Sequence, residues 1–89
     1  MPAIEIYTKD TCPYCHLAKS ILRRHGAHFD KHSLTDDPDL FAPMVERSGG
    51  GVTVPQIFIG GVAIGGSDRL AMLEEQGKLA GLLAPAADA

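Results

Sequence analysis

The sequence predicts a single α/β domain built on one four-stranded mixed sheet, with elements in the order β-α-β-α-β-β-α and helices on both faces. Three observations lead to this fold class: a strand pattern followed at once by a helical pattern, a glycine-centred hairpin, and a length of 89 residues. At this length folding buries about 60–65% of the surface of the extended chain, so one sheet supplies the core. We expect one domain over residues 1–89, with residues 84–89 as a frayed tail.

The first half of the chain is typical of a strand–helix–strand unit. Residues 4–8 alternate apolar and polar side chains, and the period then changes to that of a helix, which covers residues 13–25 and ends at Gly26. Residues 28–33 are expected to form a second strand at the edge of the sheet. Because a crossover helix separates the two strands, they should be parallel.

A second, short helix is predicted between Asp37 and the glycine run at residues 49–51. Asp37 is a capping residue, and Pro38 suits the first helical position because its missing N–H has no intrahelical partner there. Pro43 removes a backbone donor and pushes on the preceding turn. The segment should therefore kink, or become helical in earnest only near residue 42.

The last third of the chain predicts a hairpin and a final helix. Residues 56–66 give two short strands about Gly60 and Gly61, a dipeptide that is typical of a tight hairpin turn. The final helix is expected to cover residues 67–79, opened by Ser67 or Asp68 as its cap. The hairpin adds antiparallel pairs to the parallel unit, which makes the sheet mixed.

Composition and charge exclude several classes of function. The net charge of −3 argues against a nucleic acid or an anionic membrane surface as partner. No stretch approaches the roughly 18 apolar residues of a membrane span, and the first ten residues lack the features of a signal peptide. We therefore expect a cytoplasmic protein with no membrane or nucleic-acid partner.

The chemistry of the chain is concentrated in the stretch YTKDTCPYCHLAKS, which holds its only two cysteines. Because cytoplasmic reductants keep thiols reduced, a C-x2-C pair indicates redox catalysis or metal binding rather than a structural disulfide. Cys12 falls at the strand-to-helix junction, where unpaired N–H groups and the helix dipole favour the thiolate, and Pro13 stiffens this turn. Cys15 lies one turn deeper, where it can attack a mixed disulfide on Cys12. The two thiols should have unequal roles.

A zinc site is the main alternative that the spacing suggests. Cys12, Cys15, His28 and His32 satisfy the pattern C-x2-C-x12-H-x3-H of zinc fingers. The helix of a finger runs continuously into its histidine pair, whereas Gly26 ends the helix here and strand-like sequence surrounds both histidines. We therefore expect no metal and interpret the histidines as surface groups.

Three motifs together resemble the dithiol glutaredoxins: CPYC after YTK, TVPQIFI about forty residues later, and IGGSD before the last helix. The resemblance extends from residue 4 to about residue 83. It implies a thioredoxin-like fold and a glutathione-dependent oxidoreductase that reduces glutathione mixed disulfides and protein disulfides. Cys12 would be the nucleophile and Cys15 the resolving thiol. Glutathione would be the reducing co-substrate, glutathionylated or disulfide-containing proteins the other partners, and no cofactor would be bound permanently; we expect a monomer.

The resemblance also implies which residues hold glutathione. Lys9 would place a cation near the Cys12 thiolate and a glutathione carboxylate, although it could also be a solvated surface lysine. Tyr14 would flank the tripeptide. Pro55 resembles a cis-proline opposite Cys12, which lets the backbone of Val54 pair with the substrate as an added strand, with Thr53 as a side contact.

The IGGSD motif would complete this site. Gly66 permits close approach of the backbone, and the N–H groups at Ser67 and Asp68 would hold the γ-glutamyl carboxylate at the start of the helix. The Asp68 side chain would meet the glutamyl ammonium. Ser67 and Asp68 could instead be a simple helix cap, and the two roles compete for the same groups.

Two departures from the family pattern concern the affinity for glutathione. Arg69 stands where the family often has a second aspartate, and the run Gly49-Gly50-Gly51 with Val52 stands where it often has a basic or amide residue. Arg47 is the nearest replacement for that carboxylate contact, and it is equally well interpreted as a solvated arginine at a helix end.

Two other functions share the cysteine pair. A redoxin reduced by a flavoprotein reductase would not need TVP and GGSD arranged around a tripeptide. An iron-sulfur carrier would use Cys12 and one glutathione from each of two protomers, but such carriers typically have smaller residues than Pro13 and Tyr14.

Overall fold

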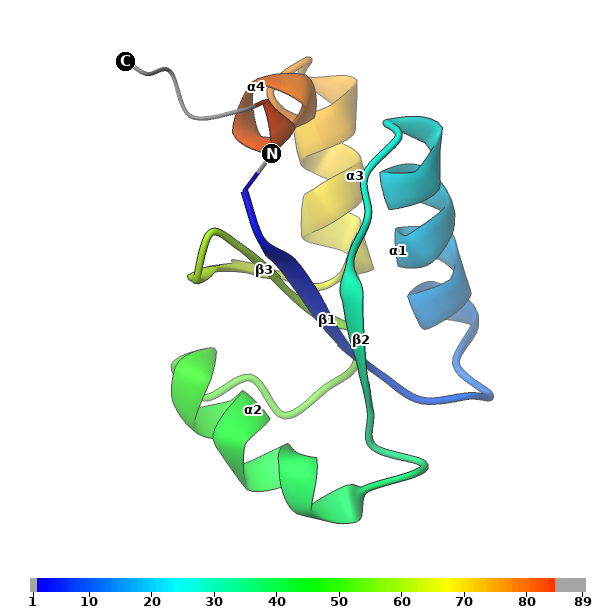
Figure 1. Cartoon of the computed structure of the whole chain (residues 1–89), viewed down its shortest axis with the longest axis vertical. Helices are drawn as coiled ribbons and strands as arrows, with labels where there is room; N and C mark the ends of the chain where they lie inside the picture. Colours follow the sequence, from blue (N-terminus) through cyan, green and yellow to red (C-terminus); the bar gives the residue numbers. More distant parts are fainter. Residues whose placement is uncertain (1, 85–89) are drawn as a thin grey trace.

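The computed structural model describes residues 2–84, arranged around one sheet with helices on both of its faces (Figure 1). The strands are β1 (Ile4–Thr8), β2 (Asp30–Ser33), β3 (Gln56–Ile59) and β4 (Val62–Gly65). The helices are α1 (Pro13–Arg24), the 3-10 helix η1 (Pro38–Leu40), α2 (Phe41–Arg47), α3 (Ser67–Glu75) and α4 (Leu79–Leu83). The tail predicted at residues 84–89 lies, apart from Ala84, outside the described residues.

The sheet is four-stranded and mixed, as the sequence predicts, with the strand order β2-β1-β3-β4. β1 pairs in parallel with the edge strand β2 and antiparallel with β3, which in turn pairs antiparallel with β4. Helix α1 supplies the crossover of the parallel pair. The hairpin turns at Gly60 and Gly61, both of which have positive φ angles that a glycine adopts without strain.

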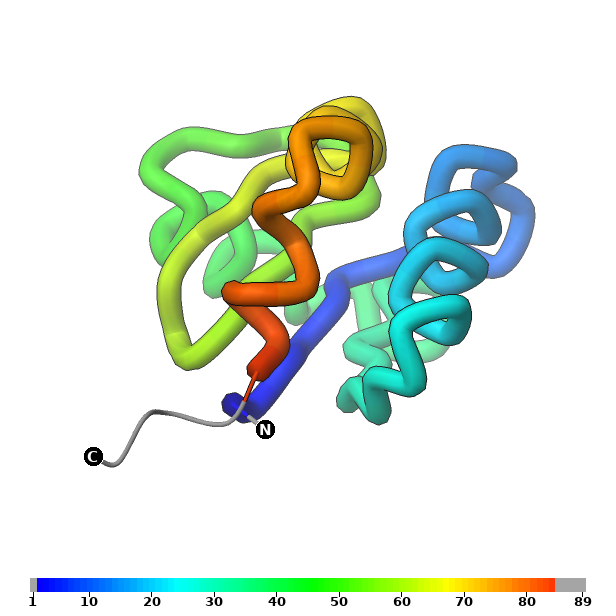
Figure 2. The backbone as a smooth tube through the Cα atoms, turned by 90° about the horizontal axis from the view of Figure 1, so that it is seen from above, coloured from blue at the N-terminus to red at the C-terminus, as the bar shows by residue number. Residues whose placement is uncertain are grey.

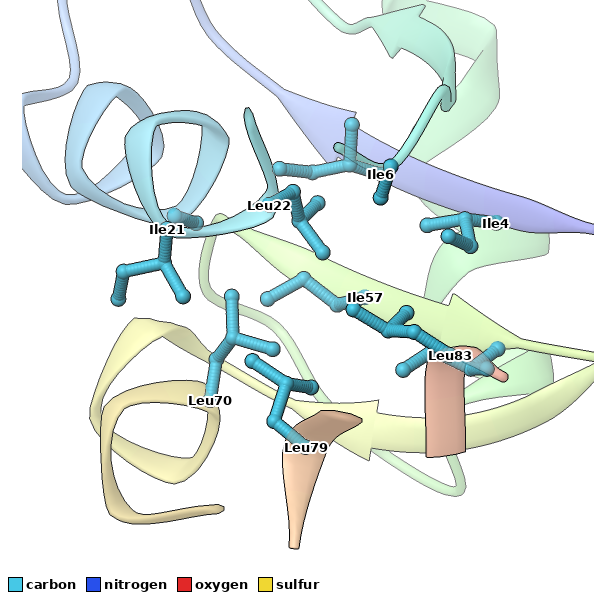
Figure 3. Packing of buried hydrophobic residues seen from close by; sticks show 11 residues of the cluster. Ile4, Ile6, Ile21, Leu22, Ile57, Leu70, Leu79 and Leu83 are labelled. Atoms are coloured by element: carbon cyan, nitrogen blue, oxygen red, sulfur yellow. The ribbon is translucent and has the colours of Figure 1, made fainter. Parts of the chain in front are cut away.

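The larger hydrophobic cluster lies on the face of the sheet that α1, α3 and α4 cover. Ile6 and Ile57 of the sheet meet Leu22 of α1, Leu70 of α3 and Leu79 of α4 (Figure 3). The buried face of α1 contains Cys15, Ala18, Ile21 and Leu22, which recur at the spacing of one helical face. The N-terminal end of β1 lies beside α4 in both views of the chain (Figures 1 and 2), and Ile4 and Leu83 share this cluster.

A smaller cluster lies on the opposite face, under α2. It consists of Tyr7, Leu34, Met44 and Phe58. The prolines act as expected: Asp37 caps a short 3-10 turn by accepting a bond from the N–H of Asp39, and regular α-helix begins at Phe41, two residues before Pro43. Helix α2 is therefore short and buries only Met44 fully.

Polar contacts of Arg47 tie the end of α2 to β1. Its guanidinium donates to both carboxylate oxygens of Glu5 at 2.8 and 3.0 Å and to the Tyr7 hydroxyl at 2.8 Å, and it lies 4.3 Å from the Phe58 ring centroid. His32 of β2 is 3.0 Å from the same carboxylate. The hydrogen bonds from Arg47 and then His32 lower the pKa of Glu5 to about 2. Arg47 is thus a paired structural residue rather than a solvated helix end.

Two expectations for the last helix are wrong. The segment is broken in two because Gly77, with a φ of +72°, ends α3 before α4 begins at Leu79. The cap of α3 is Gly66, and neither Ser67 nor Asp68 makes a capping side-chain bond in the described structure. Serine and aspartate are both common N-cap residues, but here Ser67 and Asp68 are the first two residues of the helix itself.

Candidate functional site

Cys12 is the N-cap residue of α1, with an extended backbone, and Pro13 occupies the first helical position. The backbone N–H of Cys15 donates to the Cys12 Sγ at 3.3 Å, and the sulfur is only partly covered by protein. On its other side Sγ lies 3.7 Å from the carbonyl oxygen of Val54. A sulfur that faces solvent and accepts an N–H bond at the positive end of a helix is suited to carry negative charge and attack a disulfide.

Cys15 lies one turn further along α1 and is fully buried. Burial raises the pKa of the Cys15 thiol, and its interaction with Cys12 acts in the same direction, while hydrogen bonding at Thr8 and Lys9 opposes both. Both cysteines are free thiols. The surroundings of the two sulfurs differ as the sequence predicts: Cys12 is partly exposed and Cys15 is buried one turn further along the helix.

An open pocket of about 430 Å³ lies next to the cysteine turn. Its lining comes from three segments and consists of Tyr14, Thr53, Val54, Pro55, Gly66, Ser67 and Asp68. These are seven of the eight residues that the sequence assigns to glutathione. The contact between the Val54 carbonyl and the Cys12 sulfur connects the pocket to the reactive thiol.

The β3–β4 hairpin brings the two later segments of the pocket together. β3 begins directly after Pro55, β4 ends directly before Gly66, and the register places Ile57 opposite Gly65. The peptide bond between Val54 and Pro55 is cis, as the motif implies. A Cβ on Gly66 would lie 3.2 Å from Asp68 Oδ1, a tight distance, and in ordinary contact with the Pro55 carbonyl oxygen at 3.5 Å.

The start of α3 offers groups of both signs to a ligand. The first hydrogen bond of the helix runs from the N–H of Leu70 to the carbonyl of Gly66. The N–H groups of the preceding helical residues have no partner within the helix, and they can bind a carboxylate. Asp68 is exposed and lines the pocket, where its carboxylate can bind an ammonium.

The segment before the pocket is held by two polar side chains that the sequence reasoning missed. The Ser48 hydroxyl accepts a bond from the Gly51 N–H at 2.8 Å, and the buried Gln56 amide donates to the Thr53 carbonyl at 2.9 Å. A Cβ on Gly51 would lie 2.7 Å from both side chains. No sequence motif identifies Ser48 or Gln56 as a functional residue. The one indication in the sequence is that both are polar residues close to a glycine run and a binding motif.

Several candidates lie outside the pocket lining. Lys9 is exposed on the loop before Cys12, and Arg47 is held by Glu5 and Tyr7. His16, which directly follows Cys15 in the sequence, is exposed, and its ring contacts the backbone of Asp10 at 3.1 Å. Among residues 2–84, no group of three or more histidine, cysteine or acidic side chains is placed to hold a metal ion. No helix in this range is long and apolar enough to span a membrane.

The glutaredoxin family model matches residues 4–64 of this chain. Among curated proteins, a glutaredoxin of Pseudomonas aeruginosa is 46% identical over 83 residues, which cover 93% of this chain and 98% of the relative. Glutaredoxin 3 of Escherichia coli is likewise 46% identical, over 93% of this chain and 99% of its own length.

Solved structures of glutaredoxins share the fold of this chain. The solution structure of a glutaredoxin from Brucella melitensis superposes with a TM-score of 0.79 at 51% identity, over 93% of this chain and 89% of that one. The crystal structure of a buckwheat glutaredoxin–glutathione complex gives a TM-score of 0.84 at 30% identity, over 92% of this chain and 76% of that one.

Proposed function

Because this chain belongs to the glutaredoxin family and is a thiol-disulfide oxidoreductase, we propose that glutathione is its reducing co-substrate and that it reduces glutathione mixed disulfides and protein disulfides. One observation carries this proposal: a pocket with a carboxylate and a free helix start opens beside the partly exposed Cys12 sulfur. A γ-glutamyl group has the matching pair of charges, an ammonium and a carboxylate.

In the proposed reaction the Cys12 thiolate attacks the glutathione sulfur of a mixed disulfide. A bond forms between Cys12 and glutathione, the substrate disulfide bond breaks, and the substrate sulfur leaves as a thiolate that takes a proton from solvent. The N–H that Cys15 donates to the Cys12 sulfur stabilises the attacking anion. A second glutathione then attacks the glutathione sulfur on Cys12, so that oxidised glutathione leaves and the Cys12 thiolate is restored.

A protein disulfide takes the route through both cysteines. After Cys12 has formed a mixed disulfide with the protein, the Cys15 sulfur loses its proton and attacks Cys12, and the protein thiol leaves. The resulting Cys12–Cys15 bond is reduced by two glutathione molecules. Cys15 is on the adjacent turn and buried, which fits a thiol that reacts only with a partner already attached to Cys12.

The pocket residues would hold the glutathione moiety during both routes. The backbone at Val54 would pair with the cysteinyl residue as an added strand, with Thr53 and Pro55 beside it. The helix start at Ser67 would bind the γ-glutamyl carboxylate and Asp68 its ammonium. Tyr14, with 66% of its surface exposed, would cover one side of the tripeptide.

We further propose a cytoplasmic monomer with no permanently bound cofactor. Two free thiols on one helix turn suit a compartment in which glutathione keeps such pairs reduced. The protein partners would be glutathionylated proteins and proteins with accessible disulfides. Lys9, exposed on the loop that precedes Cys12, would supply a cation near the thiolate.

A coupled assay tests the proposal directly. The protein is mixed with glutathione, glutathione reductase and the mixed disulfide of glutathione with 2-mercaptoethanol, and reductant consumption is followed by absorbance. We expect saturable turnover that depends on the protein. Turnover only when a flavoprotein thioredoxin-type reductase replaces glutathione would refute glutathione dependence and favour a reductase-fed redoxin.

A further inference from the structure

The cysteine loop, residues 9–11, connects the end of β1 to Cys12 and is exposed at all three positions. Its own backbone turn is closed by a long hydrogen bond, from the N–H of Cys12 to the carbonyl of Lys9 at 3.4 Å. A loop lacks the repeated hydrogen bonds of a helix or strand, so it keeps one conformation only where other groups hold it. The position of the Cys12 sulfur therefore depends on what else binds this loop.

Two side chains from separate segments bind the backbone of Asp10, in the middle of the cysteine loop. The N–H of Asp10 donates to the hydroxyl of Thr35, which follows β2, at 3.0 Å. The carbonyl oxygen of Asp10 lies 3.1 Å from Nε2 of His16, in the first turn of α1. Because a carbonyl only accepts, Nε2 carries the proton, in the neutral ring or in the imidazolium. The donor is thus present in both charge states of the histidine.

His16 also binds the chain on the other side of Thr11. Its backbone N–H donates to the carbonyl of Cys12 at 3.2 Å, so one residue holds the carbonyls of both Asp10 and Cys12. Exposed backbone groups can bond to water instead, so what the side chains add is a fixed path for the loop rather than satisfied polar groups. This path ends in the extended backbone of Cys12, whose sulfur accepts the N–H of Cys15 at 3.3 Å.

We infer that His16 is a positioning residue for the nucleophile: together with Thr35 its ring fixes the backbone of Asp10 and so keeps the Cys12 sulfur at the start of α1, where it can attack a disulfide. The inference concerns the attack itself, which any thiol-disulfide exchange requires, and it goes beyond the assignment of glutathione as co-substrate. The hydrogen bond carries the effect, and not the charge of the ring, because the donor is the same in both forms.

Three substitutions of His16 separate the hydrogen bond from the size and charge of the side chain. The amide nitrogen of glutamine reaches the place of Nε2, asparagine is shorter, and leucine has no donor. The measured quantity is the rate at which excess iodoacetamide alkylates Cys12 at neutral pH, with the modified residue identified by mass spectrometry; Cys15 is buried and does not compete. His16→Leu and His16→Asn should each slow alkylation about fivefold, which corresponds to about 1 kcal/mol, a typical net value for one hydrogen bond. His16→Gln should stay within about twofold of the original rate.

Thr35 provides an independent test, because it binds the same residue of the loop from the other side. Thr35→Val keeps the shape of the side chain but removes the hydroxyl, and it should slow alkylation of Cys12 about threefold, whereas Thr35→Ser keeps the hydroxyl and should keep the rate. The double variant of His16→Leu and Thr35→Val should be slowed by less than the product of the two single effects, because the loop loses its fixed path once either contact is gone. Effects that simply multiply would show that the two contacts act independently, and they would overturn the shared role.

His28→Leu is the matched control, because it removes another exposed histidine. His28 lies near Pro2 and Ala3, at the end of the sheet where β1 begins, whereas Cys12 follows the other end of this strand. Its alkylation rate should equal that of the original protein. A normal rate in His16→Leu, with or without a lower melting temperature, would overturn the inference, and so would a His16→Gln variant as slow as His16→Leu. Because the assay contains no glutathione, failure of the proposed co-substrate would leave this result unchanged.

Discussion

The two halves of the site are built in different ways. The thiol half is one continuous segment, in which the backbone N–H of Cys15 donates to the Cys12 sulfur at the start of α1. The pocket half is assembled from Tyr14 and two segments, residues 53–55 and 66–68, that only the β3–β4 hairpin brings together. Local geometry therefore positions the two thiols, whereas the pocket that we propose for recognition depends on the tertiary fold. Substitutions in the thiol half should reduce turnover of all disulfides that need the substituted thiol, whereas substitutions in the pocket half should reduce turnover of glutathione disulfides selectively.

The largest effect is expected in the thiol half. Cys12→Ser should abolish turnover of every disulfide, because the remaining thiol, Cys15, is fully buried and cannot attack a substrate disulfide itself. Cys15→Ser should retain turnover of glutathione mixed disulfides and lose that of protein disulfides, since only the second route needs a resolving thiol. The coupled assay with both substrate types distinguishes these outcomes. Equal loss in the two variants would contradict the division of roles.

The next largest effect is expected in the pocket half. Asp68→Ala should lower kcat/KM for a glutathione mixed disulfide by about tenfold, which corresponds to about 1.4 kcal/mol of a charge-assisted bond. A small disulfide without a γ-glutamyl group should be reduced at nearly the original rate. Because Asp68 makes no capping bond, its removal should cost the free energy of unfolding only the helix-dipole contribution, about 0.3–1 kcal/mol.

Glu75→Ala is the matched control for this prediction, because it removes an exposed carboxylate from the same helix outside the pocket. It should leave both substrates unaffected. If Asp68→Ala slows the two disulfides alike, Asp68 acts on the fold of α3 and not on the ligand.

A smaller, pH-dependent difference should separate the two cysteines. Burial raises the pKa of Cys15, so its thiol is largely protonated near neutral pH and the thiolate fraction grows as the pH rises toward that pKa. Closure of the Cys12–Cys15 bond on a trapped protein mixed disulfide should therefore accelerate several-fold for each pH unit, up to about tenfold. Rapid-mixing measurement of the released protein thiol between neutral and alkaline pH reports this rate. A flat profile would show that deprotonation of Cys15 does not limit resolution.

The smallest effect on activity is expected for Arg47, which belongs to neither half. Arg47→Met should leave kcat/KM for glutathione mixed disulfides within about twofold, because the guanidinium is bound to Glu5 and Tyr7 outside the pocket. The variant should instead lose about 1 kcal/mol of unfolding free energy, the upper range for a partly exposed ion pair. A tenfold loss of activity with an unchanged melting curve would restore Arg47 as a ligand.

The same variant should change the acid stability of the protein. The folded pKa of Glu5 is about 2, below the value of 4.5 expected in the unfolded chain, so its contribution is present above about pH 4.5 and is lost as the pH falls toward 2. Denaturation curves at several acidic pH values should show a shallower loss of stability in Arg47→Met than in the original protein.

The sequence predicts the fold well wherever one local signal decides the outcome. The alternation in β1, the apolar stripe of α1 and the Gly60-Gly61 turn each determine their element within a few residues, and the structure confirms all three. The break at Gly77 was missed because a single glycine is tolerated inside a helical pattern, and only its positive φ ends α3.

In the site too, features set by local sequence could be predicted and features set by tertiary contacts could not. The cysteine turn is local and could be predicted from spacing, and the three motifs identify the pocket segments through resemblance. The position of Arg47 could not be predicted, because its partner Glu5 is 42 residues away in the sequence and pairs with it only after α2 packs on the sheet. Ser48 and Gln56 were missed for a related reason: their bonds to Gly51 and Thr53 depend on the path of an irregular loop.

The turn of the hairpin that joins the two pocket segments lies well away from the pocket itself. This turn, at Gly60 and Gly61, lies four residues along each strand from the pocket, about 13 Å at the usual strand rise. A Cβ on Gly61 would meet no other atom within 4 Å. New chain ends, a reporter peptide or a tether to another protein can therefore be introduced at this turn while the segments around Pro55 and Gly66 keep their register, which makes the turn the natural entry point for engineering the protein into a redox sensor.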